Sequence, residues 1–283
     1  MRKVITKIHS FREKTFMLSV KLLFVISMIY LVWTFSRKQQ DIDWNLIFDR
    51  FITFKWIAWS FMLATLNWFL RIYKWKVAVS NIEKISLTTA SWQQLTAFAW
   101  SVFTPANAGE FLHKPLFFQE KKAVAKAVFY EQLSQMIITL FLGLLALSRL
   151  YTHPLIFKLF LGFTVLTTIW TIRSRTYFFK LILLSLLRYF SFGLFLYLGL
   201  HQAGMTNIHT AWMIPVYFLV VSFLPLLPWT DIPVKSSVAL WIFASQHSGA
   251  SLILVLIFWL WTWNTFLPAL TGQILGIHKT LRI

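Results

Sequence analysis

Charged side chains inside long apolar runs are the residues of this sequence most able to do chemistry. Arg188 lies eleven residues after Tyr177, in an apolar run that ends near Leu200. A charge near the middle of a bilayer costs about 2.5–3.5 kcal/mol on insertion scales, so we expect Arg188 to face other helices and to have a partner. Asp231 is one candidate partner, but it could instead pair with Lys235, four residues later on the same helical face. We expect all three residues to bind substrate.

A second group of candidates surrounds the segment TPANAGE, residues 104–110, where proline and glycine interrupt an apolar helix. Irregular backbone at membrane depth is tolerated only where protein or a water-filled cavity surrounds it. Helix amino termini at such a break would present positive dipole ends to an anion, for example a lipid phosphate. The alternative is an ordinary loop that caps an interfacial helix. The candidate substrate-binding residues here are Thr104, Pro105, Asn107, Gly109, Glu110 and Lys114.

Two further polar groups lie on single helical faces. Glu131 and Gln135 are four residues apart, with Ser134 beside them, and we expect the first two to bind substrate. Glu131 could instead be an end-of-helix residue near the lipid headgroups. Asn67 and Arg71 also share a face, and we expect Arg71 to extend to the cytoplasmic interface.

Signatures of enzymes and of metal or cofactor sites are missing from the sequence. There is no cysteine, the seven histidines have no metal-ligand spacing, and no phosphate-binding glycine loop or nucleophile elbow occurs. We therefore expect no catalytic residue, no metal, no cofactor and no enzymatic activity. The G-x-x-x-G at Gly272 to Gly276 lies at the end of the last apolar run, and we give it little weight as a dimer motif.

The composition defines the elements that must position these residues. Hydrophobic residues make up 58% of the 283 and charged residues only 13%, so the chain is expected to be an integral membrane protein. The 27 basic residues, against nine acidic ones, are concentrated in short segments between apolar runs. Nucleic-acid binding is excluded because no hydrophilic stretch is long enough to form a basic domain. We expect one membrane domain, residues 1–283, with no soluble catalytic domain.

The distribution of basic residues predicts the topology of an all-α transmembrane bundle. Six full spans are expected near residues 16–36, 51–70, 127–149, 154–172, 177–200 and 249–271. Full crossing by the polar stretch 86–103 would place Lys114, Lys121, Lys122 and Lys126 outside, so we predict that it enters and turns back. The broken segment 209–247 is predicted to do the same from the opposite face. Both termini are then cytoplasmic.

An internal symmetry follows from this topology. A shift of about 120 residues places TPANAGE on LPWTD, the second span on the fifth and the third on the sixth. Three crossings in each half would make the halves, 1–150 and 151–283, inverted repeats. Inverted repeats with broken helices at the midplane are a transporter architecture.

Four segments carry a resemblance to a known family: LNWFLRIYKWKVAV, FTPANAGEFLHKPLFF, FYEQLSQMIITLFLGLL and LPWTDIPVKSSVALWIF. In this order they resemble the lysylphosphatidylglycerol synthase transmembrane family, the flippase-like domain family of bacterial membranes. The resemblance covers nearly the whole chain through short motifs in a matching order. It implies a lipid-translocating domain in the bacterial inner membrane, with the P-x-x-x-G-E element of the family on Pro105, Gly109 and Glu110 and its following acidic residue on Glu131.

The sequence also departs from the family pattern. His113 or Lys114 stands for a basic residue after the G-E pair, and Glu131, Gln132 and Gln135 stand for E-R-x-x-D. The second signature has Asp231 and Lys235 where relatives often have a glycine-rich stretch ending in Arg-Glu. These differences leave the substrate open.

The leading hypothesis is therefore a membrane lipid transporter that moves a headgroup between leaflets. Its expected partners are membrane lipids, namely an anionic or aminoacylated phospholipid or a polyprenyl-linked lipid, together with a separate lipid-modifying enzyme. Two alternatives remain: a membrane enzyme, or subunit of one, acting on lipid-linked substrates, and a structural or regulatory partner without transport. The oligomeric state is open.

Overall fold

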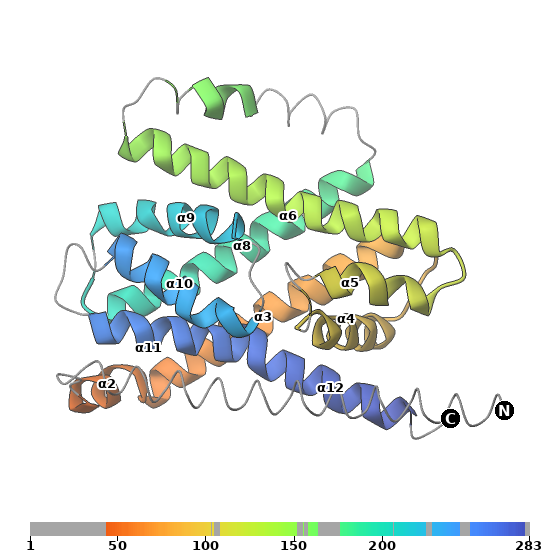
Figure 1. Ribbon diagram of the computed structural model, residues 1–283, viewed down its shortest axis with the longest axis horizontal. Coiled ribbons are helices and arrows are strands. Elements are labelled where there is room, and N and C mark those ends of the chain that lie inside the picture. Colours follow the sequence, from red (N-terminus) through yellow and green to blue (C-terminus); the bar gives the residue numbers. More distant parts are fainter. Residues whose placement is uncertain are drawn as a thin grey trace. The chain divides into compact units, whose positions relative to one another are not determined.

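The computed structural model describes residues 44–102, 104, 108–151, 155, 158–163, 176–205, 207–224, 228–243 and 250–280. These residues form helices and short turns, and no strand occurs among them. In chain order the main helices are α2 (Trp44–Phe51), α3 (Phe54–Val79), α4 (Leu87–Ser101), α5 (Ala108–His113), α6 (Lys121–Leu150), α8 (Thr176–Gln202), α9 (Ile208–Ser222), α10 (Pro228–Phe243), α11 (Ala250–Trp261) and α12 (Leu267–Thr280) (Figure 1).

Three of these helical stretches are long and apolar enough to cross a membrane: Lys121–Leu150, Tyr177–Gln202 and Ala250–Gly276. The last one joins α11 to α12 through a π-helical segment, Thr262–Phe266. The prediction of an all-helical protein with membrane-spanning helices is confirmed at this level. The expected first span, 16–36, and most of the expected fourth, 154–172, lie outside the described residues.

Helix α3 extends well beyond the apolar run predicted to end near Leu70, because the basic segment that follows is also helical. Its 26 residues begin after Thr53, whose hydroxyl accepts a hydrogen bond from Trp56 N at 3.2 Å. At 1.5 Å per residue it is about 39 Å long, enough to cross a bilayer. This extra length places Arg71 and Lys74 on the same continuous helix as Asn67.

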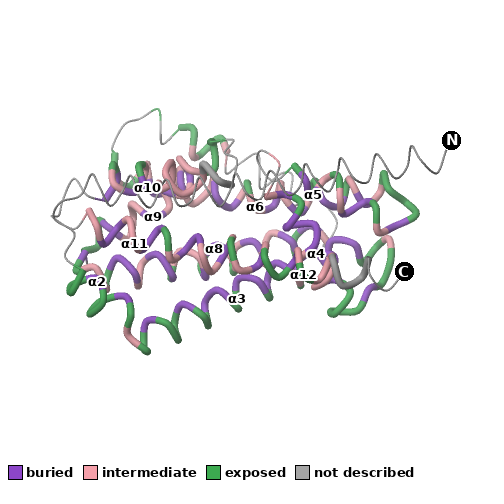
Figure 2. The backbone as a smooth tube through the Cα atoms, turned by 60° about the horizontal axis from the view of Figure 1, so that its bottom comes forward, coloured by how far each residue is buried: buried purple, intermediate pink, exposed green. Residues whose placement is uncertain are grey.

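Both predicted breaks separate two helices. Helix α4 begins after its cap Ser86 and ends at Ser101, and α5 begins at Ala108, followed by a 3-10 turn at Lys114–Phe117. Helix α9 ends at Ser222 and α10 begins at Pro228. In Figure 2 the tube of α4 is largely buried, and its buried residues include the polar Gln93, Gln94 and Thr96.

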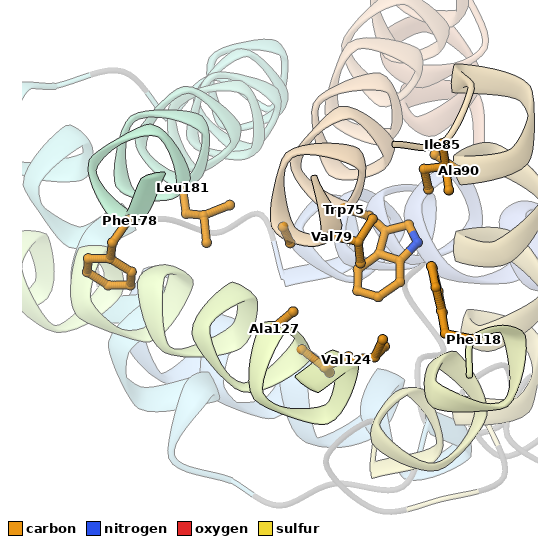
Figure 3. Close-up of a cluster of buried hydrophobic side chains, with 11 residues drawn as sticks. Trp75, Val79, Ile85, Ala90, Phe118, Val124, Ala127, Phe178 and Leu181 are labelled. Atoms are coloured by element: carbon orange, nitrogen blue, oxygen red, sulfur yellow. The ribbon is translucent and has the colours of Figure 1, made fainter. Parts of the chain in front are cut away.

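One hydrophobic cluster gathers the ends of several helices around the fully buried ring of Trp75 (Figure 3). It contains Ile85 and Ala90 from the start of α4 and Phe118 from just after the 3-10 turn. It also contains residues near the starts of α6 and α8, namely Val124, Ala127, Val128, Phe178 and Leu181. The chain that enters α4 and the chain that leaves the 3-10 turn therefore lie at the same end of α3.

Glycines allow three pairs of helices to approach closely. A Cβ on Gly272 of α12 would lie 2.0 Å from the carbonyl oxygen of Leu95 in α4, and one on Gly199 would lie 2.0 Å from Cδ1 of Leu256. A Cβ on Gly143 would lie 2.7 Å from Cβ of Leu219. Gly272 therefore packs within this chain, holding the last helix against the first broken one.

Candidate polar site between the helices

Glu110 of α5 is the centre of a buried network of charges. Its side chain is fully buried and forms ion pairs with Arg71 of α3 and with Lys114, whose ammonium lies 2.8 Å from Oε2. Gln94 of α4 donates a hydrogen bond from Nε2 to the same carboxylate at 3.3 Å. Glu110 thus links α3 to both helices that flank the first break.

Glu131 extends this network to α6. Its Oε2 lies 2.7 Å from the ammonium of Lys114, and its backbone carbonyl accepts a hydrogen bond at 2.7 Å from the ammonium of Lys74. The residue is 3% exposed, so it is not a helix-end residue in contact with headgroups. Because Lys114 contacts both carboxylates, the two acids and Arg71 are joined in one continuous chain of ion pairs.

Aromatic rings cover the two cations that pair with Glu110. The guanidinium of Arg71 lies 4.8 Å from the ring centroid of Trp68 and 4.5 Å from that of Phe98. The ammonium of Lys114 lies 4.4 Å from the centroid of Trp75. The quadrupole of an aromatic ring attracts a cation, and the attraction grows when water is excluded. These rings therefore help to keep the two cations inside the protein.

Arg188 lies in the same region but has a different kind of partner. Its Nε donates to Oδ1 of Asn67 at 3.0 Å, and Nδ2 of Asn67 donates to Oδ1 of Asn264 at 2.7 Å. Asn264 belongs to the π-helical segment and donates to the carbonyl of Leu260 at 3.0 Å. The extra residue of a π-helical turn changes which side chains face the interior, and such turns are frequent at functional sites.

We call six charged residues the buried charge cluster: Arg71, Lys74, Glu110, Lys114 and Glu131, which are buried, and Arg188, which is half-buried. The cluster contains two more basic than acidic side chains. One buried donor of the cluster, Nε of Arg71, has no hydrogen-bond partner among the described residues. Excess positive charge and an unpaired donor are costly in a medium without water, so the cluster has the composition of an anion-binding site.

The structure brings together some of the residues predicted from sequence. Glu110, Lys114, Glu131 and Arg188 all belong to the buried charge cluster. Gln135 lies one turn after Glu131 and is half-buried, and its Oε1 has no hydrogen-bond partner in the part of the chain that the structure describes. Pro105 and Asn107 lie outside the described residues.

Thr104 and Gly109 hold the first break together. The backbone N–H of Gly109 donates to the hydroxyl of Thr104 at 2.6 Å, and that hydroxyl donates to the carbonyl of Ser101 at 3.0 Å. A Cβ on Gly109 would lie 2.7 Å from Cα of Ser101, so only glycine allows this close approach. Both residues therefore position Glu110, which follows directly.

Asp231 and Lys235 are separate from the buried charge cluster. They form an ion pair with each other across one turn of α10, and both are half-buried. Of the two pairings open to Asp231, the structure therefore has the one with Lys235, and Arg188 bonds to Asn67 instead. The pair lies 121 positions after Glu110 and Lys114, with the same four-residue spacing, and each pair begins in the first turn of the helix that follows a break.

Sequence reasoning missed several members of the site. The prediction that Arg71 extends to the cytoplasmic interface is wrong: the residue is 7% exposed because the carboxylate of Glu110 meets it in the interior. Lys74 was not identified, although Asn67, Arg71 and Lys74 follow the i, i+4, i+7 spacing of one helical face. Gln94 was noted only as one of the polar residues of the stretch 86–103, and Asn264 was not identified.

Two further features complete the surroundings. An apolar groove of about 580 Å³ runs between α3, α8 and α9, and its lining includes Leu66, Leu70, Leu187, Leu194 and Ile214. Among the described residues no group of three or more histidines or acids could hold a metal ion.

Comparison with family models, with curated proteins and with solved structures finds no match to this chain.

Proposed function

We propose that this protein is a membrane lipid transporter that moves a polar headgroup between leaflets, and that the buried charge cluster is its headgroup site. The observation that carries the proposal is the excess of two basic over acidic side chains in a cluster enclosed by helices of membrane-spanning length. A merely structural ion-pair network would be expected to balance its charges, because each unpaired buried ion is costly. An anionic headgroup would restore the balance.

The hairpin of α4 and α5 is proposed to be the moving part. Its two ends meet in the Trp75 cluster, which supports a segment that enters the membrane and returns to the same side. Glu110, at the break, pairs with Arg71 of α3, and its other partners, Gln94 and Lys114, belong to the hairpin and the turn that follows it. Movement of the hairpin away from α3 would separate Arg71 from Glu110. The guanidinium of Arg71 would then be free to bind a headgroup.

The groove between α3, α8 and α9 offers a place for the lipid tail. Leu66 and Leu70 flank Asn67 in sequence, and Leu187 precedes Arg188, so the groove follows the two helix segments that carry the polar site. A headgroup near Arg188 could therefore keep its acyl chains against apolar surface. We further propose six spans with two re-entrant hairpins, an inner-membrane location, and membership in the flippase-like family whose motifs the sequence resembles.

Reconstitution into liposomes tests the proposal. Fluorescent lipids in the outer leaflet are bleached with dithionite, and the fraction of protected lipid reports movement across the bilayer. We expect movement of an anionic lipid with the native protein, a large loss with Glu110→Gln and Arg188→Gln, and no change with Lys122→Gln, an exposed residue at the start of α6. Absence of movement for anionic, aminoacylated and polyprenyl lipids alike would reject transport.

A further inference from the structure

The pairing of charges in the cluster points to the chemical class of the headgroup. We propose that the site takes a phosphate monoester, which carries two negative charges, in preference to a singly charged phosphodiester or a cationic aminoacylated headgroup. This inference rests on the proposed headgroup site and deepens it. Its determinants are Arg188 and Lys74, the two basic residues of the cluster that have no carboxylate partner.

Arg188 and Lys74 bond only to neutral groups of the described chain. The guanidinium of Arg188 donates from Nε to the amide oxygen of Asn67, and its two terminal nitrogens have no hydrogen-bond partner among the described residues. The ammonium of Lys74 donates to the backbone carbonyl of Glu131, while the carboxylate of Glu131 faces Lys114. Together they leave several N–H donors of two cations without a charged acceptor.

The described residues hold no further acid that could serve these two cations. Glu110 and Glu131 are already bonded to Arg71 and Lys114, and Asp231 is bonded to Lys235. The other acids of the described chain, Asp49, Glu83 and Glu120, are exposed. The missing negative charge is therefore expected to come from a ligand.

The net charge of the cluster sets the charge of the ligand. Its four basic and two acidic side chains leave an excess of two positive charges, and Lys74, one of the two cations without a carboxylate partner, is 1% exposed. Uncompensated charge is costly in a medium of low dielectric constant. A doubly charged phosphate would balance this excess with a single ligand. A phosphodiester supplies half of that charge, and an aminoacylated headgroup supplies less.

Binding measurements on the purified, detergent-solubilised full chain test this inference. The probes are short-chain phosphatidic acid, a monoester; short-chain phosphatidylglycerol, a diester; and inorganic phosphate, which has no tail. Titration is followed by calorimetry at about pH 8, above the second pKa of a phosphate monoester near 6, and at about pH 5, below it. We expect phosphatidic acid to bind more tightly than phosphatidylglycerol at the higher pH by about tenfold or more, the size of one charge-assisted hydrogen bond.

The preference is expected to shrink at the lower pH, because the monoester then carries one charge like the diester. Arg188→Gln and Lys74→Gln should each reduce the preference, Arg188→Lys should retain most of it, and Lys122→Gln should leave it unchanged. Thermal unfolding of each variant identifies those that no longer fold, and the intact pH dependence of the native protein keeps the test valid if a glutamine variant fails.

Equal affinities for monoester and diester at both pH values would overturn the inference, as would a preference that survives in the variant carrying both Arg188→Gln and Lys74→Gln. Inorganic phosphate binding as tightly as phosphatidic acid would show a free anion site and overturn the lipid assignment. Failure of the proposed transport function is distinguishable: lipid movement would be absent in liposomes although the monoester preference persists. The opposite result, movement without a preference, would retain transport and reject the monoester.

Discussion

The ammonium of Lys114 lies 2.7 Å from Oε2 of Glu131, so a buried ion pair joins the chain just after α5 to the long helix α6. Lys114 is fully buried, and the same ammonium also contacts Glu110. The fold of the first broken segment and the chemistry of the site thus depend on one side chain.

Lys114→Met is expected to destabilise the protein by about 3–5 kcal/mol, the usual cost of removing one partner from a buried ion pair. Glu110 would keep Arg71 as a partner, but the carboxylate of Glu131 would remain buried without a cation. Unfolding by sodium dodecyl sulfate in mixed micelles measures the change. Lys122→Met, an exposed site near the start of α6, is the control and should change stability little. Equal stability of both variants would contradict a structural role for the pair.

Gly272→Ala is expected to destabilise the contact between α12 and α4. The added methyl group would meet the backbone carbonyl of Leu95, which cannot rotate away, so the helices must separate at a cost of about 1–3 kcal/mol. Gly276→Ala is a matched control one helical turn later, because its Cβ would meet nothing closer than 3.9 Å. The same unfolding assay should therefore separate the two variants, and a larger effect at Gly276 would contradict the close approach at Gly272.

Sequence patterns identified the helical membrane character and several charged residues, because apolar runs and isolated charges are local signals. Arg188 illustrates this: its depth in an apolar run alone predicted an interior position. The partners were not predictable, since Asn67 and Asn264 are 197 positions apart and meet only through packing. The role of Arg71 was also wrong, because a basic residue at the end of an apolar run usually reaches toward water. Only the fold reveals that Glu110 lies opposite.

Asn67 and Asn264 are expected to act as one unit. Asn67→Leu would leave Nε of Arg188 without an acceptor, and Asn264→Leu would leave the amide of Asn67 without one. Each single variant should lose about 1–3 kcal/mol, the cost of an unsatisfied buried polar group. The double variant should lose less than the sum, with a coupling energy of about 0.5–3 kcal/mol. Strict additivity in a double-mutant cycle would contradict the hydrogen-bond chain.

Single cysteines test whether the first hairpin turns back. The chain has no native cysteine, so a reporter at Ser36, Lys84, Lys122 or His201 is unambiguous. A membrane-impermeant maleimide applied to intact cells should label the Ser36 and His201 positions, whereas the Lys84 and Lys122 positions should react only after the membrane is opened. Lys84, Lys122 and His201 are exposed, so failure to react from outside reports the side of the membrane rather than burial.

Labelling at the Lys122 position decides whether the first hairpin turns back or crosses the membrane. Lys84 precedes α4 and Lys122 follows the 3-10 turn, and both adjoin residues of the Trp75 cluster, Ile85 and Val124. A cluster of buried side chains cannot be shared by two opposite surfaces of a bilayer about 30 Å thick, so the two positions should always be labelled together. Labelling of Lys122 from outside, with Lys84 protected, would make α4 and α5 a full crossing. The two halves would then no longer be inverted, and the hairpin would lose its proposed role as the moving part.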